Sequence, residues 1–183
     1  MKKSALFIVD VQNDFLPGGA LAVPSGDRVI DPINRLQERF EMILASKDWH
    51  PAKTVHFDRW PVHCVRGTEG ARFPSALKID KIKQVFLKGT GESDDGYSAF
   101  EATNEDLEAY LKIHGIERLY ITGLATDYCV KATALDAAAA GFETFIVRDA
   151  VRAVNLNPGD ETKAMEIMQR AGVKIILSKD LNH

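Results

Sequence analysis

The sequence has few cysteines, no strong excess of one charge and no long apolar run. Its two cysteines, Cys64 and Cys129, are too few for a disulfide framework. A net charge of −3, with lysines and arginines scattered along the chain, argues against a nucleic-acid partner. No apolar stretch is long enough to cross a bilayer, and the first one reaches Asp10 too early for a signal peptide. We therefore expect a cytoplasmic protein with no nucleic-acid or membrane partner.

Two widespread catalytic signatures are also missing from the sequence. There is no G-x-S-x-G elbow, which argues against a serine hydrolase, and no G-x-G-x-x-G turn, which argues against a dinucleotide site. The composition is that of an ordinary globular protein: of the 183 residues, 45% are hydrophobic and 27% are charged. This length predicts a single domain over residues 1–183.

Short apolar runs alternate with helical patterns along most of the chain. The runs predict six strands near residues 5–9, 42–45, 84–87, 118–122, 142–147 and 173–177. Helices are predicted over 28–40, from a cap at Thr103 or Asn104, over 131–140, and after 157–160 with Ala164, Ile167 and Met168 on the apolar face. The alternation predicts an α/β fold, a three-layer structure whose mostly parallel six-stranded sheet has helices on both faces.

Residues able to do chemistry stand at the ends of the predicted strands. Asp10, Asp48 and Lys88 end the first three, and Cys129 follows the fourth, in the first turn of the next helix. The carboxyl ends of parallel strands meet at one edge of a sheet. A helix N-terminus favours a thiolate, and its N–H groups can hold an oxyanion. A lone helical cysteine is more often a packed thiol, but this convergence favours a nucleophile served by Asp10 and Lys88.

A second group combines Asp48 and His50 with two loop histidines, His56 and His63. Residues i and i+2 at a strand end point to the same side, so Asp48 and His50 can coordinate the same metal ion. Imidazole and carboxylate ligands favour one divalent metal ion, zinc (Zn2+) first, with iron (Fe2+) or manganese (Mn2+) as alternatives. The competing interpretation is a set of loop histidines that bind no metal. We expect Cys64, beside His63, to be a packed thiol rather than a ligand.

Three loop aromatics, Phe15, Trp60 and Tyr97, fall at the same edge of the sheet. Loop aromatics often pack as a simple lid, but beside a metal and a nucleophile they favour a pocket for a flat, ring-shaped substrate. His114 lies at a helix end and His183 at the chain terminus, and neither is assigned a role.

Seven motifs, in order from Leu6 to about Val154, carry a family resemblance. They are VDVQNDF around Asp10, PGGAL from Pro17, DWHP from Asp48, WPxHCV from Trp60, KG from Lys88, YSxF from Tyr97 and GLATDYCVKAT from Gly123. The chain resembles the nicotinamidases of the isochorismatase-like cysteine hydrolase family. The isochorismatases of that family lack the cysteine, so Cys129 favours an amidase.

The resemblance implies a Rossmann-like sheet and the deamidation of nicotinamide to nicotinic acid and ammonia, with pyrazinamide also accepted. It implies that Cys129 is the nucleophile, Asp10 the general base and Lys88 their ion-pair partner. It also implies a cis peptide bond before Ala125, whose N–H would join that of Cys129 in an oxyanion hole.

The resemblance further implies a metal held by Asp48, His50 and His63 and reached by the pyridine nitrogen of the substrate. The middle histidine of the family varies in spacing, and His56, six residues after His50, is the one available here. A short loop before Trp60 leaves open another amide or carbamoyl (ureido) hydrolase of the family. A ligand-sensing module without chemistry is disfavoured, because the catalytic residues are all present. Relatives commonly self-associate, so a homo-oligomer is expected.

Overall fold

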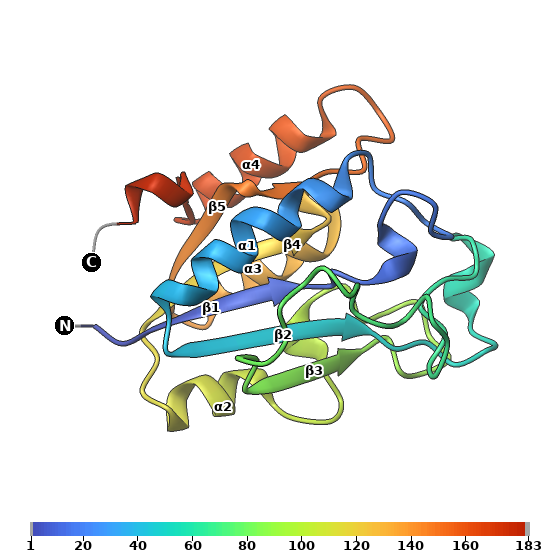
Figure 1. Cartoon of the computed structure of the whole chain (residues 1–183), viewed down its shortest axis with the longest axis horizontal. Helices are drawn as coiled ribbons and strands as arrows, with labels where there is room; N and C mark the ends of the chain where they lie inside the picture. Colours follow the sequence, from blue (N-terminus) through green and yellow to red (C-terminus); the bar gives the residue numbers. More distant parts are fainter. Residues whose placement is uncertain (1, 182–183) are drawn as a thin grey trace.

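Six parallel strands form one sheet in the order β3-β2-β1-β4-β5-β6 (Figure 1). The computed structural model describes residues 2–181, so His183 lies outside the described residues. The strands are β1 (Ser4–Val9), β2 (Met42–Asp48), β3 (Gln84–Lys88), β4 (Arg118–Leu124), β5 (Glu143–Arg152) and β6 (Lys174–Ile176). This is the strand order of doubly wound Rossmann sheets, and the predicted α/β fold is confirmed.

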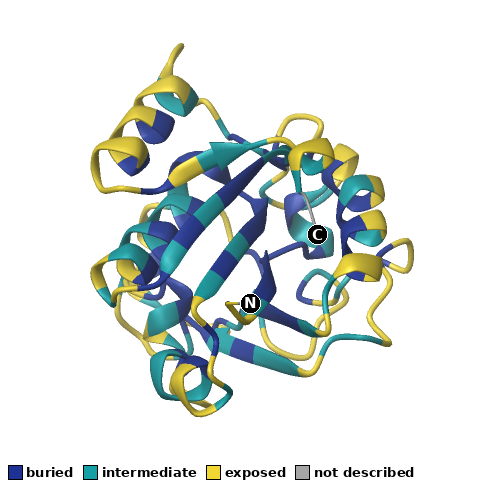
Figure 2. Ribbon diagram, turned by 90° about the vertical axis from the view of Figure 1, so that its left-hand side faces the viewer, coloured by how far each residue is buried: buried dark blue, intermediate teal, exposed yellow. Residues whose placement is uncertain are grey.

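Helices cover both faces of the sheet, because successive side chains of a buried strand point to opposite sides. The helices are α1 (Ile30–Leu36), α2 (Leu107–Ile113), α3 (Lys131–Ala139) and α4 (Asp160–Arg170). Phe7 and Val9 of β1 pack into the core cluster shared with α2, α3 and α4. Leu6 and Ile8 pack into the opposite cluster, with α1. Figure 2 shows the result, buried strands between helices that expose their outer sides.

The second face is only partly covered by helix, and an irregular segment completes it. Residues 51–83 contain one short 3-10 turn, Val55–Asp58, between β2 and β3. Cys64, Ala71 and Leu77 of this segment are buried in the same cluster as α1. The segment is therefore a packed part of the molecule, and Cys64 is the buried thiol that its sequence context predicted.

The cap of α2 differs from the prediction. Asp106 caps this helix, and its carboxylate accepts a hydrogen bond from the Ala109 N–H at 2.9 Å. Asn104 instead bonds the backbone of β3, accepting from Leu87 N at 2.7 Å and donating to Val85 O at 2.9 Å. The reason is that β3 is an edge strand whose outward backbone groups need partners.

The apolar face of α4 also differs by one residue. Ala164, Met165 and Met168 are buried, whereas Ile167, predicted on this face, is 44% exposed.

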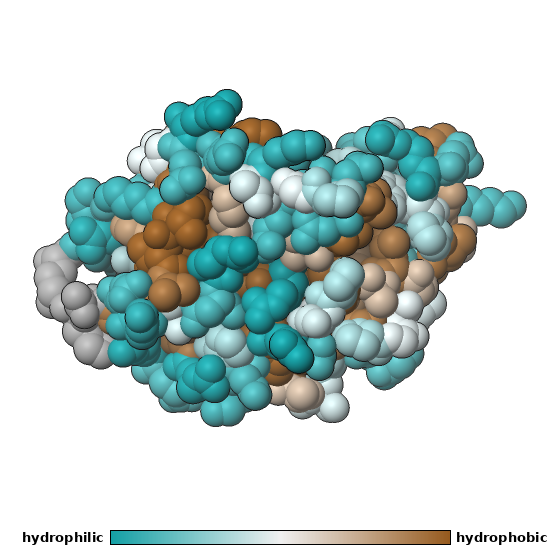
Figure 3. All heavy atoms as spheres, turned by 90° about the horizontal axis from the view of Figure 1, so that it is seen from above, coloured by the Kyte–Doolittle hydropathy of each residue, from teal (hydrophilic) through white to brown (hydrophobic). Residues whose placement is uncertain are grey.

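Figure 3 shows that hydrophilic side chains cover much of the surface seen from above, with hydrophobic patches between them. None of the helices within residues 2–181 is long and apolar enough to cross a membrane.

Candidate active site

The four residues predicted at the strand ends meet at the carboxyl edge of the sheet. In Figure 1 the arrowheads of β1, β2 and β3 point toward the loops that gather on this side. Asp48 and Lys88 end β2 and β3 and are paired in register across the two strands. Asp10 follows β1, and Cys129 lies in a π-helical turn, Thr126–Val130, between β4 and α3. Each side chain is thus placed by the end of a different strand.

Lys88 is the fully buried centre of this group. Its Nζ donates to Asp48 Oδ1 and, at 2.8 Å, to the carbonyl oxygen of Gly96. A third hydrogen bond reaches Cys129 Sγ, 3.4 Å away. An ammonium has only three hydrogens to donate. Asp10 Oδ2 also lies 2.8 Å from Nζ, in a salt bridge, so four acceptors share these three hydrogens. Asp10 Oδ2 receives no hydrogen bond from any other described residue.

Asp10 is a buried carboxylate poised to accept a proton. Its Oδ1 accepts a hydrogen bond from Ser46 Oγ at 2.7 Å. A carboxylate oxygen of Asp10 lies within 4.8 Å of Cys129 Sγ. Burial raises the pKa of Asp10 above its ordinary value, although Lys88 opposes the shift. A more basic carboxylate is a better general base near neutral pH.

The thiol of Cys129 rests in its protonated form. Burial raises the pKa of Cys129 well above its usual range, and Lys88 only partly offsets this. This direction is opposite to the thiolate expected at a helix start. The first reason is burial, and the second is that the single positive charge of Lys88 already faces two carboxylates, Asp10 and Asp48, so a buried thiolate would add a third negative charge to the group. Proton removal therefore has to accompany attack on a substrate.

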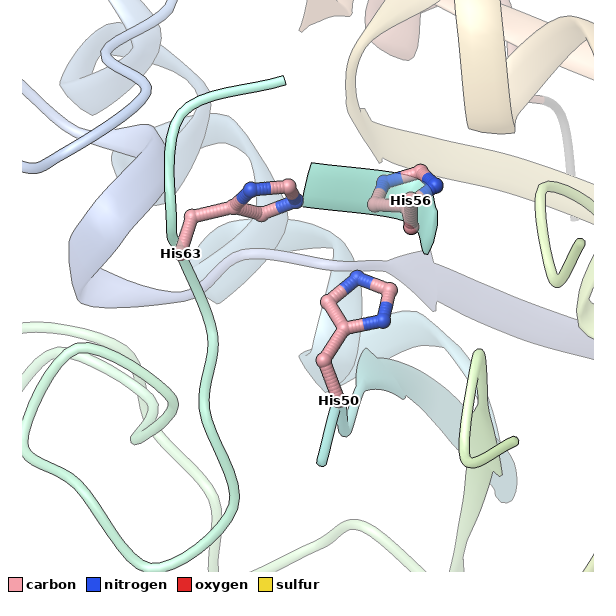
Figure 4. Close-up of side chains that lie close together, drawn as sticks. All are labelled: His50, His56 and His63. Atoms are coloured by element: carbon pink, nitrogen blue, oxygen red, sulfur yellow. The ribbon is translucent and has the colours of Figure 1, made fainter. Parts of the chain in front are cut away.

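Three histidine rings converge on one space beside this group (Figure 4). His50, His56 and His63 are all buried, and each has a ring nitrogen within 4.8 Å of those of the other two. His50 lies two residues after the end of β2, whereas His56 and His63 come from the irregular segment that follows. The structure thus brings together all three histidines that the sequence singled out as ligands.

Two of the rings are oriented by backbone carbonyls. His50 Nδ1 lies 2.9 Å from the Gly89 oxygen, and His63 Nδ1 lies 2.6 Å from the Pro61 oxygen. A carbonyl can only accept, so each Nδ1 carries the hydrogen and each Nε2 has a free lone pair. Gly89 is required beside this ring, because a Cβ there would lie 2.5 Å from His50 Cε1.

His56 is oriented by a carboxylate that sequence reasoning missed. Its Nδ1 lies 2.7 Å from Asp94 Oδ1, which as a carboxylate accepts the hydrogen. Asp94 belongs to the polar loop after β3, and its spacing from His56 carries no periodic signal. The second acidic residue beside it, Asp95, is exposed, so only the structure separates the two.

Asp48 joins the histidines to Lys88. Its Oδ2 lies 3.6 Å from His50 Nε2 and 3.8 Å from His63 Nε2, while Oδ1 accepts from Lys88. Burial alone would raise the pKa of Asp48, but the Lys88 ammonium holds it well below its usual range. The buried His50 Nε2 has no hydrogen-bond partner among the described residues. Three free imidazole nitrogens beside an ionised carboxylate fit a divalent metal ion.

Polar residues of the motif around Asp10 hold the surrounding backbone in place. The Gln12 amide accepts from Asp48 N at 2.8 Å and donates to Asp48 O at 2.8 Å and Ala71 O at 3.0 Å. Asp14 Oδ2 accepts from Cys64 N at 2.7 Å. These bonds tie the irregular segment to the end of β2, next to His50 and His63.

A pocket that opens to solvent lies over the nucleophile and the histidines. The three predicted aromatics, Phe15, Trp60 and Tyr97, line it, and sequence reasoning missed Tyr128. The Trp60 and Tyr128 rings stand edge to face at 5.1 Å, and Trp60 Nε1 donates to Tyr97 OH at 3.0 Å. The remaining apolar lining comes from Leu21, Val23, Leu124 and Val154. Such walls suit a small flat ring.

The chain before Cys129 offers a backbone donor to the same pocket. The Leu124–Ala125 peptide bond is cis, as the resemblance implies, and Ala125 lines the pocket. Within residues 2–181 the Ala125 N–H donates no hydrogen bond to the protein. Gly123 allows the approach of β4 to β1, because a Cβ there would lie 2.0 Å from the Val9 oxygen.

Comparison with known proteins gives one consistent result. The isochorismatase domain model matches residues 4–180. A nicotinamidase of Escherichia coli is 40% identical over 98% of this chain and 97% of the relative. The structure of an Acinetobacter baumanii nicotinamidase and pyrazinamidase has a TM-score of 0.93 at 39% identity, covering 100% of this chain and 99% of that one. The pyrazinamidase of Pyrococcus horikoshii, solved in complex with zinc, has a TM-score of 0.87 at 43% identity, covering 96% and 99%. This chain belongs to the isochorismatase-like hydrolase family.

Proposed function

We propose that this protein is a cysteine amidohydrolase that deamidates nicotinamide to nicotinate and ammonia and also accepts pyrazinamide. The observation that carries the proposal is the contact of Lys88 with Cys129, Asp10 and Asp48 beneath an aromatic-walled pocket. The full-length nicotinamidase relatives support the choice of substrate. A flat pyridine ring fits between the aromatic walls, with its carboxamide toward Cys129.

In the first half of the reaction, Asp10 takes the proton of Cys129 while the sulfur attacks the amide carbonyl carbon. Lys88 stabilises the developing charge, since its Nζ already contacts both groups. The oxyanion is received by the N–H groups of Ala125 and Cys129. Collapse breaks the C–N bond, and the proton held by Asp10 passes to the leaving nitrogen, so that ammonia departs and a thioester remains.

In the second half, a water molecule attacks the thioester carbonyl while Asp10 again accepts a proton. Collapse of this intermediate releases the carboxylic acid, which ionises to nicotinate. The sulfur recovers its proton from Asp10. One carboxylate thus serves as base and then acid in each half, which its raised pKa favours. The sum is amide plus water giving acid plus ammonia.

Asp48, His50, His56 and His63 would hold one divalent metal ion, with zinc favoured by the donor set over iron or manganese. When bound, the ion acts as a positive anchor for the ring nitrogen of the substrate and so orients it. The protein contributes the orientation of the three histidine rings. Each Nδ1 is held by a hydrogen bond to an oxygen, which leaves each Nε2 free to bind the ion.

The deciding experiment is an ammonia-release assay on the purified protein. We expect rapid release from nicotinamide and pyrazinamide and little from N-carbamoyl (ureido) compounds. Faster release from a ureido compound would overturn the substrate assignment and place the chain with the carbamoyl hydrolases of the family.

Metal removal tests the second part of the proposal. Elemental analysis should find about one divalent ion per chain, and dialysis against a chelator should abolish activity and lower the melting temperature. A ligand present at 100 times its Kd stabilises a fold by ~2.7 kcal/mol, so the shift should be easy to measure. Activity and stability that ignore the chelator would contradict the metal site.

We place the enzyme in the cytoplasm, because its mechanism requires Cys129 to stay reduced. We propose that residues 1–183 act as one domain, since both core clusters pack on the same sheet. Self-association is expected from the behaviour of the family, and light scattering after gel filtration will give the assembly size.

A further inference from the structure

Asp94 connects the histidine group to the pocket wall. Its side chain is 21% exposed and lies in the loop between β3 and α2. One oxygen, Oδ1, receives the Nδ1 hydrogen of His56 at 2.7 Å and also the hydroxyl of Tyr97 at 3.2 Å. Tyr97 in turn accepts from Trp60 Nε1 at 3.0 Å. An unbroken chain of hydrogen bonds therefore runs from Trp60 in the aromatic wall of the pocket to His56, one of the three histidines that could bind a metal ion.

The other oxygen of Asp94 fixes the orientation of the carboxylate. Arg59 Nη1 lies 2.6 Å from Asp94 Oδ2, although the Arg59 side chain is 68% exposed. With Arg59 on one oxygen and His56 on the other, the plane of the carboxylate is set from both sides. A charge-assisted pair of this kind is shorter and stronger than a neutral hydrogen bond.

The backbone around Asp94 is bonded to the two regions that it joins. Val55 N donates to Glu92 O at 3.0 Å. This bond ties the loop of residues 89–98, here called the Asp94 loop, to the 3-10 turn that carries His56. Two residues beyond Asp94, the Gly96 oxygen accepts from Lys88 Nζ at 2.8 Å. The Asp94 loop thus spans the gap between the histidines and the buried ammonium.

Asp94 differs in kind from the groups that orient the other two rings. His50 and His63 donate to neutral backbone carbonyls, whereas His56 donates to an anion. A carboxylate behind an imidazole fixes its tautomer and also increases the electron density that Nε2 can offer to a metal ion. His56 is the ligand that comes from the 3-10 turn in the middle of the irregular segment, so it depends most on a side-chain partner.

We propose that Asp94 is a positioning residue with two effects, one on each side of the site. Through Nδ1 it holds His56 with Nε2 toward the metal ion, and through Tyr97 it holds the Trp60 wall against which the substrate ring packs. The proposal rests on the metal site of the proposed function. It makes the loop after β3 a determinant of metal affinity and of substrate affinity together.

Metal affinity measured without substrate tests the first effect. Competition with a chromophoric chelator gives the zinc affinity of the unaltered protein and of the variants. Asp94→Asn keeps the shape and removes the charge, and we expect an affinity about 10- to 100-fold weaker. Asp95→Asn is the matched control, because it removes the same charge from the exposed neighbour and should leave affinity unchanged. Asp94→Glu should restore part of the loss.

Kinetics test the second effect. Tyr97→Phe cuts the link to Trp60 but leaves His56 its partner, so KM for nicotinamide should rise while zinc affinity stays close to that of the unaltered protein. Cobalt substitution adds a spectroscopic readout, since the visible absorption of bound Co2+ should change in Asp94→Asn and not in Asp95→Asn.

His56→Ala separates failure of this proposal from failure of the metal site. If His56→Ala loses zinc affinity and Asp94→Asn matches the unaltered protein, the role of Asp94 is overturned and the metal site stands. If His56→Ala also keeps full affinity, the ligand set itself is wrong and this proposal falls with it.

Discussion

The two ends of the sheet each gather charged side chains from neighbouring strands, but they treat them in opposite ways. At the amino end, Glu143 at the start of β5 pairs with Lys2 at 3.1 Å, Arg118 at 2.9 Å and Lys174 at 2.7 Å. These partners lie in solvent, and their hydrogen bonds, that of Lys174 first, lower the pKa of Glu143 to about 2. The result is a surface ion-pair network of the ordinary kind.

At the carboxyl end, Lys88 pairs with Asp10 and Asp48 while all three are buried. Here burial raises the pKa of Asp10, the reverse of what pairing does for Glu143. Burying charges costs several kcal/mol per ion, which a fold can avoid by using apolar residues instead. Charge pairing alone therefore does not mark a functional site. Burial of the pair, with a nucleophile in contact, does.

Among substitutions in the buried group at the carboxyl end of the sheet, Cys129→Ala should have the largest effect on activity. Without the sulfur no thioester forms, and turnover should fall by roughly 10^4-fold or more, as is usual for removal of a nucleophile. Ammonia release under single-turnover conditions measures this, and nicotinate binding by calorimetry shows that the pocket survives. Activity near that of the unaltered protein would remove Cys129 from the mechanism.

Asp10→Asn should come next, with a loss of about 10^2- to 10^4-fold, the usual range for general acid–base catalysis. The amide keeps the bond from Ser46 but has no charge with which to accept the thiol proton. The same change at the other end, Glu143→Gln, should leave kcat unaltered. Equal losses in the two variants would show that the two ends of the sheet do not differ in function.

The two groups should also differ in what they contribute to stability. Lys88→Met leaves two buried carboxylates without their partner, and the free energy of unfolding should fall by about 3 to 5 kcal/mol. Lys174→Met removes one partner of an exposed network and should cost about 0 to 1 kcal/mol. Urea titration of the metal-free proteins measures both. A cost for Lys174→Met as large as that for Lys88→Met would contradict the role assigned to burial.

The smallest effect concerns pH at the amino end. The folded-state pKa of Glu143 is about 2, below the ordinary value of 4.5, so its ion pairs stabilise the fold fully above pH 4.5. That contribution should disappear as the pH falls from 4.5 toward 2. The difference in unfolding free energy between the unaltered protein and Glu143→Gln should therefore shrink over this window. A difference independent of pH would mean that the pairs do not form in solution.

Much of the fold could be predicted because buried parallel strands read as continuous apolar runs. The residues that end those runs, Asp10, Asp48 and Lys88, were predictable for the same reason, since a polar residue that closes a buried strand lies at the sheet edge. Element boundaries were less predictable. Asn104 has the chemistry of a helix cap, but the structure uses it to bond the edge strand β3.

The parts that sequence could not predict lie in irregular backbone. Asp94 and Tyr128 take part in the site through contacts that neither periodicity nor strand position foretells. The raised pKa of Cys129 was also out of reach, because it depends first on how deeply the thiol is buried and then on the buried charges around it. A helix start suggests a thiolate, and only the packed environment reverses that expectation.

The partners of the three histidines have a consequence for how this enzyme can change over generations. His50 and His63 are oriented by main-chain oxygens, which every amino acid possesses and no substitution at Gly89 or Pro61 deletes. His56 is oriented by a side chain, which one codon change can alter. The partner of His63 is thus retained whatever residue replaces Pro61, whereas His50 also needs Gly89, because a Cβ there would lie 2.5 Å from the His50 ring. In the proposed metal site, His56 is therefore the histidine whose orientation a single change of its partner side chain can adjust.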